Sequence, residues 1–184
     1  MNAVARSDEA ALIRRIQERA VDREAAFAEI FASYRVRVFG LCRHIVSTRA
    51  DAEDATQEVF FALHRALPGF RGDSSLGTFV HRIAVRVAIR YRGRRRPEVG
   101  PLDQLPAPTA GDPIEARQDQ ERLWRALERL SIEHRTVLGL FAVEELGHRE
   151  IAAVLGIPEG TVWSRLHLAR KRLAALLEED GPAR

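Results

Sequence analysis

The chain has 184 residues, of which 46% are hydrophobic and 30% charged, with one cysteine and a net charge of +3. This composition excludes a disulfide scaffold and a Cys-rich zinc module, and no apolar run approaches the roughly 18 residues of a membrane-spanning helix. The N-terminus lacks the apolar core of a signal peptide, so we expect a cytoplasmic protein with no membrane insertion.

Charge is segregated along the chain. Residues 76–97 contain seven arginines and no acid, and residues 161–177 contain four cations and no acid. Residues 51–58 contain four acids and no base. A GC-rich genome would explain the abundance of arginine and alanine, but not this clustering. The pattern indicates polyanion-binding surfaces and a separate protein-facing surface.

The first half of the chain is predicted to be helical. Apolar residues recur every three or four positions over 27–45 and again over 59–67, which is the spacing of an amphipathic helix. Asp51, with Asp54 three residues later, is typical of a helix N-terminus. Pro68-Gly69 is expected to end that helix.

One face of this predicted helix is unusual. On a helical wheel, Asp54, Glu58 and Phe61 lie opposite the apolar stripe. An aromatic residue between carboxylates is costly to leave in water, which favours a docking surface for another protein. The alternative is a solvated face with Phe61 packed against a neighbouring helix.

Another helix is expected to begin at Ser74 or Ser75 and to run through Tyr91 into the arginine run. Arginines recur on it at four-residue intervals and form one stripe, which continues into Arg92 and Arg94–Arg96; its first members are Arg82, Arg86 and Arg90. A solvated helix usually mixes charges of both signs. This stripe carries positive charges only, which favours contact with a phosphate backbone.

A proline-rich segment then interrupts the helical pattern. Residues 97–113 hold five of the eight prolines, a density that no helix tolerates. We predict a first domain of residues 1–96, a Pro-rich linker of 97–117 and a second domain of 118–184. Further helices are expected over about 114–130, 132–143 with Ser131 as cap, 148–155 and 159–178. The predicted fold class is all-α, in two small helical domains joined by a Pro-rich linker.

The second domain contains the sharpest local motif. Residues 148–155 form a short amphipathic helix, Gly156 suits a tight left-handed turn, and Pro158 and Glu159 suit the next helix start. This pattern predicts a helix-turn-helix. Its second helix is expected to bury Val162, Leu166, Ala169, Leu173 and Leu176, and to present polar groups to DNA: Thr161, Ser164, Arg165, His167, Lys171 and Arg172. An ordinary helical hairpin with a solvated basic face is the alternative.

Taken together, these motifs closely resemble one bacterial family. The segments are DAEDATQEVF (51–60), ALPGFRGDSS (66–75), TFVHRIA (78–84) and GTVWSRLH (160–167). In this order they resemble RNA polymerase sigma factors of the extracytoplasmic function (ECF) group. The resemblance implies a factor that binds core RNA polymerase, recognises −10 and −35 promoter elements and promotes initiation for a stress or envelope-response regulon.

The resemblance also implies roles for matching positions. The residues that it implies for binding core polymerase are Asp54, Gln57, Glu58 and Phe61. The residues that it implies for binding the −10 single strand are Phe70, Arg71, Ser74, Ser75, Phe79, Arg82, Arg86, Arg90, Arg94 and Arg95. Contact with the double-stranded −35 element falls to Thr161, Ser164, Arg165, His167, Lys171 and Arg172. A separate anti-sigma factor is the expected regulator, because no fused sensory domain follows the last helix.

Four positions depart from the usual family pattern. Phe79 stands where Trp is common, and Arg86 stands where Asn is common. Trp163 and Leu168 stand in the recognition helix at positions where basic residues are common. These departures affect which promoter sequence we expect the protein to recognise.

Two other classes of function are alternatives. A stand-alone repressor or activator would use the same helix-turn-helix, but it gives no reason for the acidic face or the single-sign arginine stripe. An enzyme is disfavoured because the six histidines show no metal-ligand spacing, and no phosphate loop or nucleophile motif appears. We therefore expect no catalytic residues, no metal and no cofactor, and we expect Cys42 to lie in the core.

Overall fold

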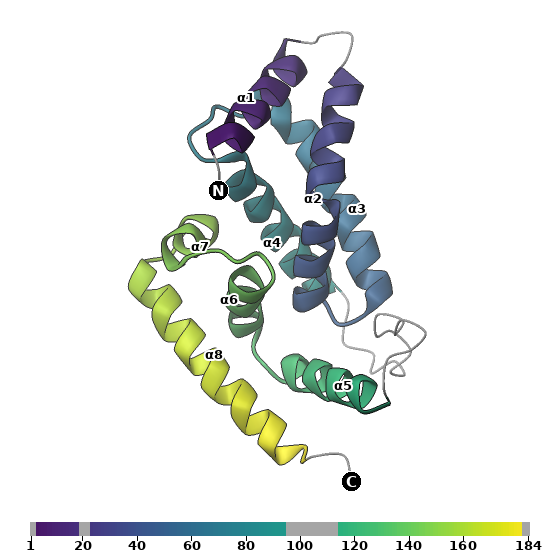
Figure 1. Cartoon of the computed structure of the whole chain (residues 1–184), viewed down its shortest axis with the longest axis vertical. Helices are drawn as coiled ribbons and strands as arrows, with labels where there is room; N and C mark the ends of the chain where they lie inside the picture. Colours follow the sequence, from purple (N-terminus) through teal and green to yellow (C-terminus); the bar gives the residue numbers. More distant parts are fainter. Residues whose placement is uncertain (1–2, 19–22, 95–113, 182–184) are drawn as a thin grey trace.

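The structure is a computed structural model that describes residues 3–18, 23–94 and 114–181. Every regular element in these ranges is a helix, so the predicted all-α fold class is confirmed (Figure 1). The elements are α1 (Ala3–Gln17), α2 (Arg23–Ile45), α3 (Arg49–Ala66), the 3₁₀ turn η1 (Leu67–Gly69), α4 (Leu76–Arg94), α5 (Ile114–Glu128), α6 (Ile132–Ala142), α7 (His148–Leu155) and α8 (Glu159–Glu179).

The first bundle is built on α2, α3 and α4, which pack along one another and share a core of aliphatic side chains. Thr48 caps α3, because its hydroxyl accepts a hydrogen bond from the Asp51 amide at 3.0 Å. The prediction that Asp51 caps this helix was therefore wrong by three residues. Ser75 caps α4 by accepting from the amide of Thr78.

Helix α1 was missing from the predicted elements. It lies across α2 and η1 and buries Ile16, which is 2% exposed. Its last residue, Gln17, donates to the carbonyl of Phe70. The helix thereby closes one side of the loop that leads into α4.

The second bundle begins with α5 at Ile114, and the bounds of its helices match those predicted to within two residues. Ser131 caps α6 by accepting from the His134 amide. Gly156 ends α7 with φ 67°, the left-handed conformation that a residue without a Cβ adopts at little cost. Helices α7 and α8 then form the predicted helix-turn-helix, with Val162, Leu166, Ala169 and Leu176 buried and Leu173 partly buried.

The two bundles contact each other. Helix α6 packs on α2, and α7 packs on α4 (Figure 1). Arg135 of α6 is fully buried there, and its guanidinium donates to the carbonyls of His44 at 2.7 Å and Val46 at 3.0 Å. Burial lowers the pKa of Arg135 to about 9, so this side chain is still charged at neutral pH.

Of the predicted linker of residues 97–117, residues 97–113 lie outside the described residues, and residues 114–117 belong to α5. Within the described ranges, no helix is both long enough and apolar enough to cross a membrane.

Candidate nucleic-acid and protein interfaces

An exposed surface on α3 carries the four residues predicted to contact polymerase. Asp54, Gln57 and Phe61 are exposed, and Glu58 is half-buried. The ring of Phe61 is 69% exposed, so it is not packed against a neighbouring helix. We call Asp54, Gln57, Glu58 and Phe61 the acidic face.

The acidic face is tied to α4 by two contacts. The hydroxyl of Tyr91 donates to Oδ2 of Asp54 at 2.8 Å, and the guanidinium of Arg90 pairs with the carboxylate of Glu58. Arg90 belongs to the arginine stripe. The predicted protein-facing and DNA-facing surfaces are therefore adjacent, and they share an ion pair.

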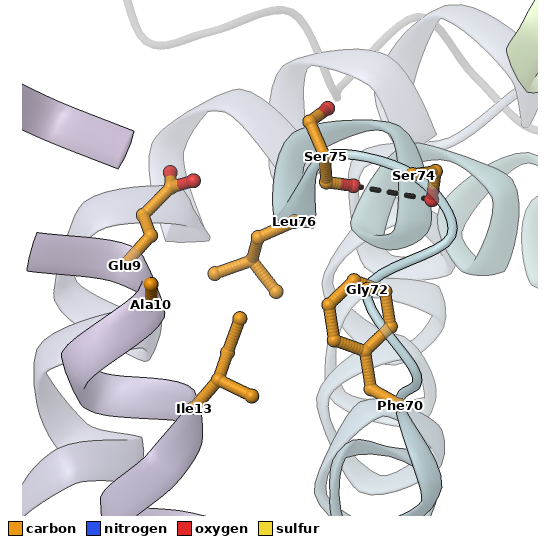
Figure 2. A pocket seen from close by; sticks show the side chains of 8 residues that line it. All are labelled: Glu9, Ala10, Ile13, Phe70, Gly72, Ser74, Ser75 and Leu76. Atoms are coloured by element: carbon orange, nitrogen blue, oxygen red, sulfur yellow. Dashed lines mark hydrogen bonds between the residues drawn. The ribbon is translucent and has the colours of Figure 1, made fainter. Parts of the chain in front are cut away.

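The loop before α4 borders a pocket of about 370 Å³ (Figure 2). Its walls come from α1, from the loop and from the first residue of α4: Glu9, Ala10, Ile13, Phe70, Gly72, Ser74, Ser75 and Leu76. The ring of Phe70 packs against that of Phe79, with centroids 4.7 Å apart. The pocket thus combines an aromatic ring with two hydroxyls, while Arg71 is exposed beside it.

Helix α1 contributes a carboxylate to this pocket. Oε1 of Glu9 accepts a hydrogen bond from the hydroxyl of Tyr34 at 2.7 Å. Burial and this bond raise the pKa of Tyr34 above its ordinary value. Glu9 was not predicted from the sequence. Helix α1 carries no motif, and only the folded structure shows that it lies beside the loop before α4.

The arginine stripe of α4 is divided by its contacts. Arg82 donates twice to the carbonyl of Ala153 in α7, at 2.9 and 2.8 Å. Arg90 is paired on α3 as above, while Arg86 between them is exposed. The side chains of Arg94 and Arg95 lie outside the described residues.

One member of the predicted stripe was wrongly assigned. Arg92 turns inward, and its guanidinium donates to the carbonyl of Ile45 at 3.0 Å. Partial burial lowers its pKa. A four-residue period would have excluded Arg92, which lies two residues beyond Arg90 and so points to another side of the helix.

The outward side of α8 carries the residues predicted to meet the −35 element. Ser164, His167, Lys171 and Arg172 are exposed, whereas Thr161 and Arg165 are half-buried. The two departures from the family pattern are also exposed, with Trp163 at 61% and Leu168 at 52%. They add apolar surface to a helix that is otherwise polar on this side.

A buried polar pair between the bundles was also missed. His81 of α4 and Glu144, in the turn after α6, are 3% and 2% exposed, and Nε2 of the one lies 2.6 Å from Oε2 of the other. No local signal predicts this contact, because the residues are 63 positions apart. In the described part of the chain, no cluster of His, Cys, Asp and Glu is arranged to hold a metal ion.

Comparison with known proteins gives matches in both halves of the chain. The family model described as Sigma-70 region 2 matches residues 30–98, and the one described as Sigma-70, region 4 matches residues 120–173. The RNA polymerase sigma-H factor of Pseudomonas aeruginosa is 33% identical over 183 residues, covering 91% of this chain and 92% of that protein. The ECF RNA polymerase sigma-E factor of Escherichia coli is 32% identical over 177 residues, covering 88% and 90%.

Solved structures with the same fold include CnrH in complex with the cytosolic domain of CnrY, at a TM-score of 0.73 and 25% identity, covering 95% of this chain and 99% of that chain. Another is the sigma factor RpoE in complex with the anti-sigma factor NepR from Bartonella quintana. Its TM-score is 0.66 and its sequence identity is 23%, and the match covers 83% of this chain and 96% of that chain.

Proposed function

Since the chain belongs to the ECF group of bacterial RNA polymerase sigma factors, we propose a division of labour between its two bundles. Residues 1–96 bind core polymerase and the −10 element, residues 97–117 join the domains, and residues 118–184 read the −35 element. Sigma factors are initiation factors rather than enzymes, so this chain supplies promoter recognition and leaves RNA synthesis to the polymerase.

The acidic face of α3 is the proposed contact with core polymerase. The single observation that carries this assignment is Phe61, whose ring is 69% exposed on a face with two carboxylates. An aromatic anchor within a polar rim is typical of protein interfaces. The partner surface complementary to it is basic, with an apolar pocket for the ring.

The pocket before α4 is the proposed site for a base of the −10 strand. Phe70 supplies a ring for stacking, and Ser74 and Ser75 supply hydroxyls that pair with base edges. Arg86, exposed on α4, holds the strand by its phosphates. Extruding a base costs a few kcal/mol of stacking, which these contacts offset together with polymerase.

Helix α8 is the proposed −35 reader. Its exposed Ser164, His167, Lys171 and Arg172 lie on the second helix of a helix-turn-helix, the element that such domains place in the major groove. Arg82 is engaged by Ala153 of this same motif. Holding the −10 strand with Arg82 therefore requires its guanidinium to give up the carbonyl of Ala153.

Regulation by a separate anti-sigma factor is part of the proposal. The CnrH and RpoE structures that share this fold are complexes, the second of them with an anti-sigma factor. We propose that this chain acts in the bacterial cytoplasm on stress- or envelope-response promoters and that such a partner restrains it there.

Transcription in a purified system tests the function. Core RNA polymerase is incubated with fragmented genomic DNA of the source bacterium, with and without the full chain. Defined RNA 5′ ends that appear only with the chain support a sigma factor. A stand-alone repressor or activator would instead protect an operator from nuclease without core polymerase and would add no new 5′ ends.

A further inference from the structure

Two aromatic side chains on α8 form a stacked pair. The rings of Trp163 and His167 have centroids 5.6 Å apart and planes only 4° apart, and both residues are exposed. Residues four positions apart lie about 40° apart around a helix, so they share one side of it. The pair therefore presents one stacked aromatic edge to solvent from the recognition helix.

Two polar residues beside the pair, Ser164 and Arg165, interact with other groups of the chain. The hydroxyl of Ser164 donates to the carbonyl of Thr161 at 3.0 Å. Arg165 is half-buried and close enough to Glu133 to interact with it electrostatically. His167, in contrast, is exposed and oriented by an aromatic neighbour, so its ring nitrogens are available to a base edge.

We propose that Trp163 is a positioning residue for base reading: its indole fixes the ring of His167, which donates an N–H hydrogen bond to N7 of a purine in the −35 major groove. This inference rests on the proposed −35 role of α8. Both purines present N7 there as an acceptor, and pyrimidines do not. Trp163 thereby contributes to specificity although it replaces a cation.

Leu168 serves as the matched control. It is exposed and apolar on the same helix, at 52%, but five positions from Trp163 it lies about 140° away around the helix axis. The two departures from the family pattern therefore do not form one apolar patch. Removing Leu168 changes exposed apolar area without touching the stacked pair.

The experiment uses holoenzyme reconstituted from core polymerase and full-length variants. Duplexes randomised across the −35 element of a promoter used by the wild type are selected for binding. Trp163→Ala and His167→Ala are expected to lower a purine preference at the same base pair by about fivefold to twentyfold. The double variant should lose no more than either single change, because the two residues act as a unit. Trp163→Phe, which still stacks, and Leu168→Ala should keep the preference.

A chemical substitution in DNA separates base reading from a merely structural role. Replacing the purine by its 7-deaza analogue removes N7 alone. This change should weaken binding by wild type and Trp163→Phe to the level of His167→Ala, and should have no further effect on His167→Ala or Trp163→Ala.

Several results would overturn the inference. One is a purine preference that survives Trp163→Ala, and another is loss at two different base pairs in the two single variants. A third is unchanged −35 selection together with loss of a protein partner, which would make the pair a protein contact. If the wild-type holoenzyme shows no −35 preference at all, it is the proposed role of α8 that fails.

Discussion

Nε2 of His81 lies 2.6 Å from Oε2 of Glu144, and this buried contact joins α4 of the first bundle to the turn after α6 in the second. Arg37 of α2 approaches the same carboxylate at 3.8 Å. Glu144 therefore brings together three helices that are far apart in the chain. Its side chain is fully buried, and His81 and Arg37 compensate Oε2 for the loss of water, whereas Oε1 has no hydrogen-bond partner among the described residues.

Glu144→Gln is expected to lower the free energy of unfolding by about 1–3 kcal/mol, because it weakens a charge-assisted bond and leaves a buried polar group poorly paired. Urea denaturation at neutral pH measures this. The adjacent exposed residue provides the control, since Glu145→Gln should stay within about 0.5 kcal/mol of wild type. Equal stability of the two variants would show that the buried pair contributes nothing.

Stability should depend on pH through His44. Burial lowers the pKa of His44 below its ordinary 6.5, with smaller contributions from Arg135 and Arg43. Below pH 6.5 the unfolded chain therefore binds a proton that the folded protein resists. Stability falls as the pH decreases through this window, by at most about 1.4 kcal/mol per pH unit, and the group has no effect at higher pH.

His44→Gln should remove that part of the pH dependence. Denaturation curves between neutral and mildly acidic pH, measured for both proteins, give the difference directly. Parallel profiles for the variant and the wild type would contradict the assignment.

Backbone strain is expected at Glu145, the one non-glycine residue in the described ranges with positive φ, at 53°. It follows α6 in a turn closed by a bond from the Leu146 amide to the carbonyl of Leu140. Glu145→Gly should stabilise the protein by about 1 kcal/mol, because glycine adopts this conformation without the Cβ penalty. Ala174→Gly, in the exposed interior of α8, should destabilise it by about 1 kcal/mol. Thermal unfolding compares the two, and a loss of stability in both would argue against strain.

Arg86 should contribute a phosphate contact. Binding of holoenzyme to a forked −10 duplex is measured over a range of salt concentrations. Arg86→Gln is expected to flatten the plot of log affinity against log salt by about 0.7–0.9 units, as for one neutralised phosphate. Arg129→Gln, which breaks surface ion pairs with Glu179 and Asp180, should leave the slope unchanged. A slope unaffected by Arg86→Gln would mean that this arginine is merely solvated.

Local signals explain what the sequence predicted well. The bounds of α7 and the left-handed Gly156 follow from a short apolar period ended by a glycine. Ser131 was predicted as the cap of α6, and the cap of α4 was predicted to be Ser74 or Ser75, because a hydroxyl just before a helix accepts hydrogen bonds from its free amides. The exposed position of Phe61 follows from its place opposite the apolar stripe of α3.

Non-local contacts explain what the sequence did not predict. Arg135 stands in an apolar helix, and its acceptors are the carbonyls of His44 and Val46, about 90 residues earlier. Helix α1 carries none of the motifs that marked the other helices, and its place in the fold follows from the distant neighbours that bury Ile16. Thr48 was passed over as a cap because Asp51, three residues later, offered the stronger acidic signal.

The acidic face offers two probes that leave the ties between α3 and α4 intact. Asp54 and Glu58 contact Tyr91 and Arg90, so reversing their charges also disturbs packing. Phe61 and Gln57 are exposed, which allows substitution with little effect on the fold. Val36, an exposed apolar residue of α2 at 70%, is the matched control.

Co-elution with core RNA polymerase on gel filtration tests the central claim most directly. Wild type and Val36→Ser should elute with the polymerase. The double variant Gln57→Arg, Phe61→Ser should elute alone while keeping its helical circular dichroism and unfolding midpoint, because interface anchors of this kind contribute 2 kcal/mol or more, roughly 30-fold in affinity each. Undiminished co-elution of the folded double variant would contradict the account.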